Sequence, residues 1–123
     1  MTPLLALPLV MTLANPSFDA AFCKMLTDSA VKVNSEKGSM VDSITRNDGM
    51  VVSCNTKSVE FKKSLTVNAS QLKDGWQAFH EKRRNEALCK LEDLAFAVNT
   101  GWSVAMPSTT LDGKTFTLIA KCD

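Results

Sequence analysis

The clearest structural signal in the chain is GWSVAMPSTTLDGKTFTLIAKC, residues 101–122. Apolar and polar residues alternate on both sides of Asp112-Gly113, a dipeptide typical of tight hairpin turns. The apolar positions are Trp102, Val104 and Met106 before the turn and Phe116, Leu118 and Ala120 after it. Alternation with a period of two is typical of strands that bury one face. The chain is therefore predicted to end in a β-hairpin.

Two helices are predicted before this hairpin. Apolar residues recur at three- and four-residue steps from Ser70, which can cap the first helix, to Asn99. The predicted buried stripe contains Leu72, Trp76, Phe79, Ala87, Leu88, Leu91, Leu94, Ala95 and Val98. We expect a kink near Cys89-Lys90 that divides the run into a helix pair. Gly101 is the expected stop, because glycine readily adopts the left-handed conformation at a helix C-terminus.

Residues 39–67 carry strand signals but leave the position of one turn open. Either a hairpin turns at Asp48-Gly49, or one long bulged strand passes through that dipeptide and turns at Asn55-Thr56-Lys57-Ser58. The run from Val59 to Val67 alternates as a strand with one wet face. Lys63 interrupts its apolar side, and we expect an edge strand there because an inward charge discourages strand addition.

The amino-terminal part of the domain is predicted to be helical. Pro16-Ser17 followed by Asp19 indicates a helix start, and apolar residues then recur at helical spacing to Asn34. The order of elements is thus a helix, two or three strands, a helix pair and a hairpin. This order predicts an α+β fold, with an antiparallel sheet of about four strands on which the N-terminal helix and the central helix pair are packed. Residues 15–123 are expected to form a single domain, since a chain of this size builds one core.

Residues 1–14 are predicted to be a secretory signal peptide. They contain no charged side chain, and their apolar run of about ten residues is shorter than the ~20 that a membrane span needs. Thr12 and Ala14 place small residues at positions −3 and −1 of a cleavage site, so the mature chain is expected to begin near Asn15. The alternative is a buried N-terminal strand or helix, which Pro3 and Pro8 disfavour. No integral membrane segment is expected.

Four cysteines, Cys23, Cys54, Cys89 and Cys122, support export. They form an even set without a Cys-x-x-Cys pair, which argues against a zinc ribbon or a thioredoxin-type redox site. Two disulfides formed in an oxidising compartment are therefore expected, and four buried thiols in a cytosolic protein are the alternative. Four cysteines allow three connectivities.

Charge and composition narrow the class of function. The 14 Lys+Arg residues nearly balance 13 Asp+Glu, and a net charge of +1 gives no electrostatic reason to expect a nucleic-acid partner. The single histidine, His80, and the basic run Lys82-Arg83-Arg84 are expected on a solvated helix face. No cluster of His, Cys or carboxylates has metal-ligand spacing, and the isolated glycines form no phosphate cradle. The sequence therefore predicts no catalytic, metal-binding or cofactor-binding residue.

The carboxyl half has a layout that resembles small bacterial periplasmic proteins. It runs from Leu88-Cys89 through a short Leu-rich helix, Gly101 and two strands around Asp112-Gly113 to Cys122. Over about residues 40–122 this is similar to the pilotin lipoproteins of one type II secretion subclass. The resemblance implies a disulfide between Cys89 and Cys122, and Cys23 then pairs with Cys54 by elimination. The chain departs from those proteins in having no lipid-attachment cysteine and no tyrosine.

The sequence thus predicts a small, exported, disulfide-stabilised bacterial protein, periplasmic or secreted, that acts by binding another protein. The resemblance adds the possibility of an accessory or pilotin-like factor of an envelope or secretion system. Two alternatives stay open: a small periplasmic hydrolase that uses His80 with a distant carboxylate or serine, and a secreted inhibitor of another protein. An exposed His80 on a convex surface would count against the hydrolase, whereas an apolar groove between helices would favour a peptide-binding protein.

Overall fold

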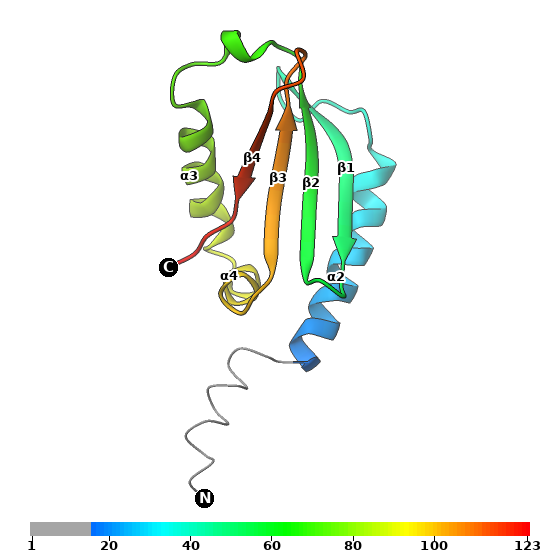
Figure 1. Ribbon diagram of the computed structural model, residues 1–123. Helices are drawn as coiled ribbons and strands as arrows, with labels where there is room; N and C mark the ends of the chain where they lie inside the picture. The colour runs from blue at the N-terminus through cyan, green and yellow to red at the C-terminus, as the bar shows by residue number, and fades with distance from the viewer. Residues whose placement is uncertain (1–15) are drawn as a thin grey trace, which may run out of the picture.

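The computed structural model describes residues 16–123, in which helices flank a four-stranded sheet (Figure 1). The elements in chain order are α2 (Pro16–Ser35), β1 (Thr45–Ser53), β2 (Ser58–Leu65), the short 3-10 helix η2 (Ala69–Gln71), α3 (Trp76–Leu88), α4 (Glu92–Asn99), β3 (Ser103–Thr109) and β4 (Thr115–Ile119). Helix α2 lies alongside β1, and α3 lies alongside β4 at the opposite side of the sheet (Figure 1). The predicted signal peptide, residues 1–14, lies outside the described residues. None of the helices between residues 16 and 123 is both long and apolar enough to cross a membrane.

The sheet has the order β1-β2-β3-β4, and its outer pairs, β1 with β2 and β3 with β4, are antiparallel. The predicted α+β class and the number of strands are confirmed. The central pair differs from the expectation, because β2 and β3 run parallel, with Val59 opposite Val104. The reason is the connection between them, which crosses over through α3 and α4 and returns the chain to the end of the sheet where β2 began.

Strand β1 passes straight through Asp48-Gly49, so the second of the two alternatives for this region is correct. The register shifts between Asn47 and Gly49, which is a β-bulge, and the chain turns only at residues 54–57. Gly49 has φ +110°, and a Cβ atom there would lie 2.7 Å from the side-chain oxygen of Asn34. Gly49 therefore allows α2 to pack closely against the bulge in β1, and it does not form a hairpin turn.

Two asparagines fasten the end of α2 to this bulge. The Asn47 side chain donates to the carbonyls of Val33 (2.9 Å) and Glu36 (3.1 Å) and accepts from the Gly49 N–H (2.9 Å). Asn34 accepts from the Met50 N–H at 2.7 Å and donates to the Met50 carbonyl at 3.1 Å. Asn47 thus binds carbonyls at and just beyond the end of α2, and Asn34 binds the backbone of β1 next to the bulge, so side chains from both elements join them.

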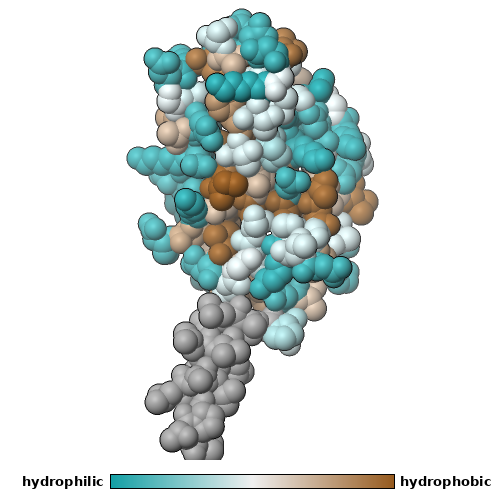
Figure 2. Space-filling view, in the orientation of Figure 1, coloured by the Kyte–Doolittle hydropathy of each residue, from teal (hydrophilic) through white to brown (hydrophobic). Residues whose placement is uncertain are grey.

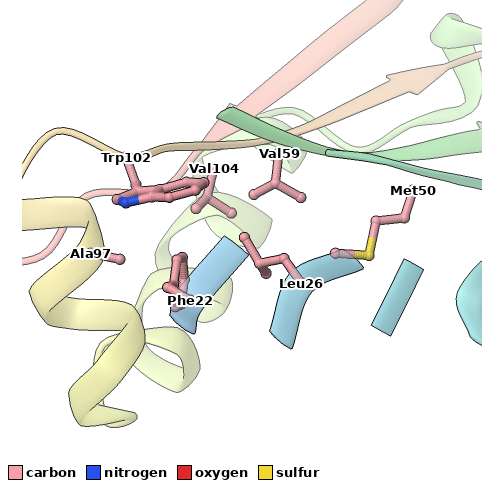
Figure 3. Close-up of a cluster of buried hydrophobic side chains, with 7 residues drawn as sticks. All are labelled: Phe22, Leu26, Met50, Val59, Ala97, Trp102 and Val104. Atoms are coloured by element: carbon pink, nitrogen blue, oxygen red, sulfur yellow. The ribbon is translucent and has the colours of Figure 1, made fainter. Parts of the chain in front are cut away.

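The core lies between α2, α4 and one face of the sheet, which we call the inner face. Seven buried side chains form it, namely Phe22, Leu26, Met50, Val59, Ala97, Trp102 and Val104 (Figure 3). The Trp102 ring packs edge-on against Phe22 with 4.9 Å between centroids, and its indole N–H donates to the Asp19 carboxylate at 2.9 Å. A buried indole needs such an acceptor, so this one contact fixes α2 to the start of β3.

Two expectations about buried positions are wrong. Lys63 does not mark an edge, because β2 lies between β1 and β3. The predicted stripe on α3 is largely absent: no residue of α3 is buried, Trp76 is half-buried and Phe79 is 56% exposed. Helix α3 stands beside the edge strand β4 instead of lying over the sheet, which leaves its apolar residues only partly covered.

The two disulfides join Cys23 to Cys54 and Cys89 to Cys122, the pairs expected from the sequence. The first, with 5.8 Å between its Cα atoms, ties α2 to the turn after β1. The second, with 5.5 Å between its Cα atoms, ties the end of α3 to the chain beyond β4. Helix α3 has no buried side chain, whereas α2 has two. We therefore expect the Cys89–Cys122 disulfide to matter more for the position of α3 than the Cys23–Cys54 disulfide does for the position of α2.

We predict that replacing Cys89 and Cys122 together by Ala lowers the free energy of unfolding by about 3–4 kcal/mol, the chain-entropy value for a loop of this length. The amides of α3 should also lose protection from hydrogen exchange. The matched control replaces Cys23 and Cys54 by Ala, which should cost similar stability and leave α3 protected, since α2 keeps its buried Phe22 and Leu26. Chemical denaturation and hydrogen-exchange mass spectrometry measure both effects. Full protection of α3 in the first variant would contradict this account.

Candidate functional site: an apolar groove beside α3

Helix α3 is held at the sheet edge by polar side chains spaced four residues apart. Gln77, Glu81 and Asn85 all reach the outer backbone of the C-terminal strand. The contacts run from Gln77 Nε2 to the Thr117 carbonyl (3.2 Å), from the Ile119 N–H to Glu81 Oε2 (2.8 Å), and from the Lys121 N–H to Asn85 Oδ1 (3.2 Å). Asn85 also donates to the Ile119 carbonyl at 3.4 Å. We call these contacts the edge contacts of α3.

The spacing of the edge contacts follows from backbone geometry. Four residues of an α-helix rise about 6 Å, and two residues of a strand advance about 6.7 Å. Every fourth residue of α3 can therefore meet every second residue of the edge strand. An unpaired strand edge invites pairing with another chain, and side chains that occupy its N–H and C=O groups remove that hazard. They also set α3 beside the sheet and away from its inner face.

The position of α3 leaves a groove of about 290 Å³ over the inner face of the sheet. Its floor includes Phe61, Met106 and Leu118 from three neighbouring strands. Its walls come from all three helices and the α3–α4 connection, with the apolar side chains Leu26, Leu88, Leu91 and Leu94. Leu91 is 57% exposed, so apolar surface continues from the groove to the outside. The arrangement is an open apolar site with several large aliphatic walls.

The view in Figure 2 shows one side of the molecule, where hydrophilic residues cover most of the surface and hydrophobic ones gather in a band across the middle. Outside the groove, large apolar side chains that are exposed include Val31, Val51 and Leu111. They come from separate elements, α2, β1 and the β3–β4 turn. The groove differs from them because several elements converge on one hollow.

Two cations, Lys63 and Arg84, also line the groove. Lys63 follows Val59 and Phe61 on the inner face of β2 and is half-buried, whereas Arg84 reaches the groove from α3 and is exposed. Burial, and then the nearby charge of Arg84, lower the pKa of Lys63. Burial likewise lowers the pKa of Arg84. Each of these shifts is a sign that the charged side chain has lost solvation without a close counter-ion.

The carboxylates near this pair are engaged elsewhere. Asp42 accepts the N–H groups of Ile44 (2.9 Å) and Thr45 (2.8 Å), and although burial raises its pKa, these hydrogen bonds outweigh it and hold the pKa below the usual value. Asp48 forms an ion pair with Arg46 at 3.0 Å and accepts from Ser64. Burial also raises its pKa, and the contacts with Ser64 and Arg46 again bring it below the usual value. Glu81 is bound to the Ile119 N–H.

His80 lies outside the groove lining. It is exposed on α3, where its ring contacts Trp76 (4.8 Å between centroids) and Phe79 (5.2 Å). Within residues 16–123 no hydrogen bond joins His80 to a carboxylate or a hydroxyl group, and no group of three or more His, Cys, Asp or Glu residues is placed to hold a metal ion. The basic run Lys82-Arg83-Arg84 is exposed as expected, and Arg84 also lines the groove.

Three residues of the groove, Lys63, Glu81 and Asn85, have a recognisable pattern in the sequence. Lys63 occupies an inner-face position of an alternating strand, which places a charge on a buried face whatever the strand order. Gln77, Glu81 and Asn85 follow one another at four-residue steps, which makes a polar stripe that a helix packed only through apolar residues would not need. The sequence of the helix does not indicate that these side chains bind the edge of β4.

Comparison with known proteins finds similarity in fold and none in sequence. No protein-family model matches the sequence, and no curated protein matches it by sequence. Two solved structures share this fold. One is the pilotin EpsS of the Vibrio vulnificus type 2 secretion system, with a TM-score of 0.61 and 11% identity over 87% of this chain and 94% of that one. The other is a predicted secreted protein of Pseudomonas aeruginosa, with a TM-score of 0.60 and 13% identity over 85% of this chain and 92% of that one. The resemblance inferred from the sequence is thus confirmed for the fold.

We predict that Glu81→Ala lowers the free energy of unfolding by about 1–2 kcal/mol, because it removes a carboxylate that accepts a backbone N–H. The amide of Ile119 should then exchange faster with solvent. Glu86→Ala, which removes an exposed carboxylate from the same helix, is the control and should change stability by less than about 0.5 kcal/mol. Urea denaturation and NMR-detected hydrogen exchange report the two effects. Unchanged exchange at Ile119 would show that the edge contacts do not hold α3.

Proposed function

We propose that this chain is an exported bacterial protein that binds another protein by taking an apolar segment of it into the groove beside α3. The observation that carries the proposal is the groove itself, where Phe61, Met106 and Leu118 form an apolar floor under walls from three helices. Amphipathic segments bind such grooves through a few apolar anchors, which is a recurring mode of peptide recognition. The chain would act as a binding protein without catalysis.

The size and shape of the groove favour a protein segment. Its volume of about 290 Å³ is slightly below the range of roughly 300–1,000 Å³ that is typical of small-molecule pockets. Leu91 at its rim is 57% exposed, so a ligand can extend beyond the hollow onto the surface. A segment of a larger partner would bury both parts, whereas a small molecule would leave Leu91 exposed to water.

Several features support export to the periplasm or beyond the cell. The two disulfides are typical of proteins that fold in an oxidising compartment. The neighbours by fold are a secretion-system pilotin and a predicted secreted protein. We therefore propose that residues 1–14 are a signal peptide and that residues 15–123 form the mature single domain. An accessory role in an envelope or secretion system is the pathway that these neighbours suggest.

The alternative functions fare differently. The hydrolase alternative would need a group bonded to His80, whose ring contacts are with Trp76 and Phe79 and whose charge acts on the Asp42 carboxylate without a hydrogen bond between them. A secreted inhibitor would also bind a protein, and it would use the same groove only if its target supplied an apolar segment. Identification of the bound partner separates an inhibitor from an accessory factor.

Site-specific photocross-linking tests the proposal in the bacteria that make the protein. A benzophenone amino acid is placed at Leu91, at the rim of the groove, and in a second strain at Leu111, which is 68% exposed and lies in the β3–β4 turn. Both positions are exposed, so neither replacement should unfold the protein. We expect a discrete adduct of higher mass from position 91 and none from position 111. Absence of any adduct at position 91, or equal adducts at both positions, would contradict binding at the groove.

A further inference from the structure

The groove is apolar, yet it contains two positive charges close enough to influence each other. Lys63 lines the hollow from β2 and Arg84 lines it from α3, and the charge of Arg84 lowers the pKa of Lys63. Within residues 16–123, the ion pairs join Lys24 to Asp28, Arg46 to Asp48 and Lys57 to Asp19, and none includes Lys63 or Arg84. No hydrogen bond from either side chain is found among the described residues.

Two such cations are costly in the free protein. Lys63 is half-buried and Arg84, although exposed on α3, is partly desolvated where it lines the groove, and the charge of Arg84 disfavours the charged form of Lys63. A neutral apolar ligand that filled the groove would remove more water from both charges and return nothing. An anionic group between them would replace the lost hydration and relieve the repulsion at the same time.

We propose that the groove selects a protein segment that carries a carboxylate next to its apolar anchors, and that Lys63 and Arg84 bind this carboxylate. The inference rests on the proposed function and adds the chemistry of the partner to it. The apolar side chains of the segment would lie on Phe61 and Met106, with an Asp, Glu or C-terminal carboxylate facing the two cations. Arg84 offers the planar fork that pairs with carboxylates, and Lys63 adds a point charge from below.

The surrounding acids do not compete for this position. Glu81 also lines the groove, but its carboxylate accepts the Ile119 N–H. Asp42 and Asp48 raise the pKa of Lys63 from a distance while they bind backbone groups, Ser64 and Arg46. A fatty acid also combines a carboxylate with an apolar body. The exposed apolar rim at Leu91 favours a protein segment over a single alkyl chain.

Three fluorescently labelled amphipathic peptides of about 15 residues test the inference. Each has Leu at helical i, i+4 spacing, and the positions beside the Leu stripe are Glu in the first, Gln in the second and Lys in the third. Fluorescence anisotropy gives the dissociation constant of each for the full chain, and decanoate is titrated as a competitor. We expect the Glu peptide to bind about tenfold or more tightly than the Gln peptide and the Lys peptide to bind most weakly.

Matched variants separate the two cations from general charge. The double substitution Lys63→Met and Arg84→Met should make the Glu and Gln peptides bind equally. The control is Lys62→Met with Arg83→Met, which removes the same charge from the chain neighbours of these residues. Lys62 is exposed on the outer face of β2, and Arg83 lies over the Phe79 ring at 5.6 Å. Neither lines the groove, so the control should keep the preference for Glu.

Each contrary result has a distinct meaning. Equal affinity of the Glu and Gln peptides for the native protein would overturn the inference and leave the groove as a protein-binding site. Loss of the Glu preference in the control pair would also overturn it, since net charge alone would then explain the effect. Decanoate that displaces the Glu peptide at a lower concentration than the peptide's own dissociation constant would assign the groove to a lipid. Binding of none of the peptides would count against the proposed function, and the inference would fall with it.

Discussion

The position of α3 depends on hydrogen bonds between its side chains and the backbone of an edge strand. No side chain of α3 is buried, so the hydrophobic effect alone does not fix this helix. Gln77, Glu81 and Asn85 hold it against the outer backbone of β4, and the Cys89–Cys122 disulfide closes its end. Because these contacts keep α3 beside the sheet, a groove is left over the inner face between the helices. The groove is thus a consequence of how the edge is covered.

Much of the fold could be predicted from the sequence, since local patterns report which face of an element is buried. The alternation around Asp112-Gly113 predicts the final hairpin, and the helical spacing before Asn34 predicts α2. Alternation does not report which strand lies beside which, so the parallel pairing of β2 and β3 was missed. For the same reason, Lys63 was wrongly expected on an edge strand. Phe79 was expected in a buried stripe because spacing alone cannot distinguish a helix over a sheet from one beside it.

The groove could not be predicted, for the same physical reason. Phe61, Met106 and Leu118 each look like ordinary core positions in the sequence, and only the arrangement of the strands and of α3 shows that they share the floor of one groove. At 11% and 13% sequence identity, the two neighbours share the architecture of this chain. They do not indicate which side chains line its site. Among its apolar walls the groove of this chain has two cations, Lys63 and Arg84, that form no ion pair within residues 16–123. Its chemistry therefore follows from Lys63 and Arg84 and cannot be inherited from the neighbours.

The most direct test of the central claim is an NMR measurement of where a bound segment lies. Isotope-labelled protein is titrated with the Glu-containing amphipathic peptide, and intermolecular contacts are recorded to the Phe61 ring and to the side chains of Met106 and Leu118. The account predicts contacts to all three of these groove residues, with amide shifts concentrated on the inner face. Contacts confined to the outer face, at Lys62 and Thr117 for example, would show that the groove beside α3 is not the binding site.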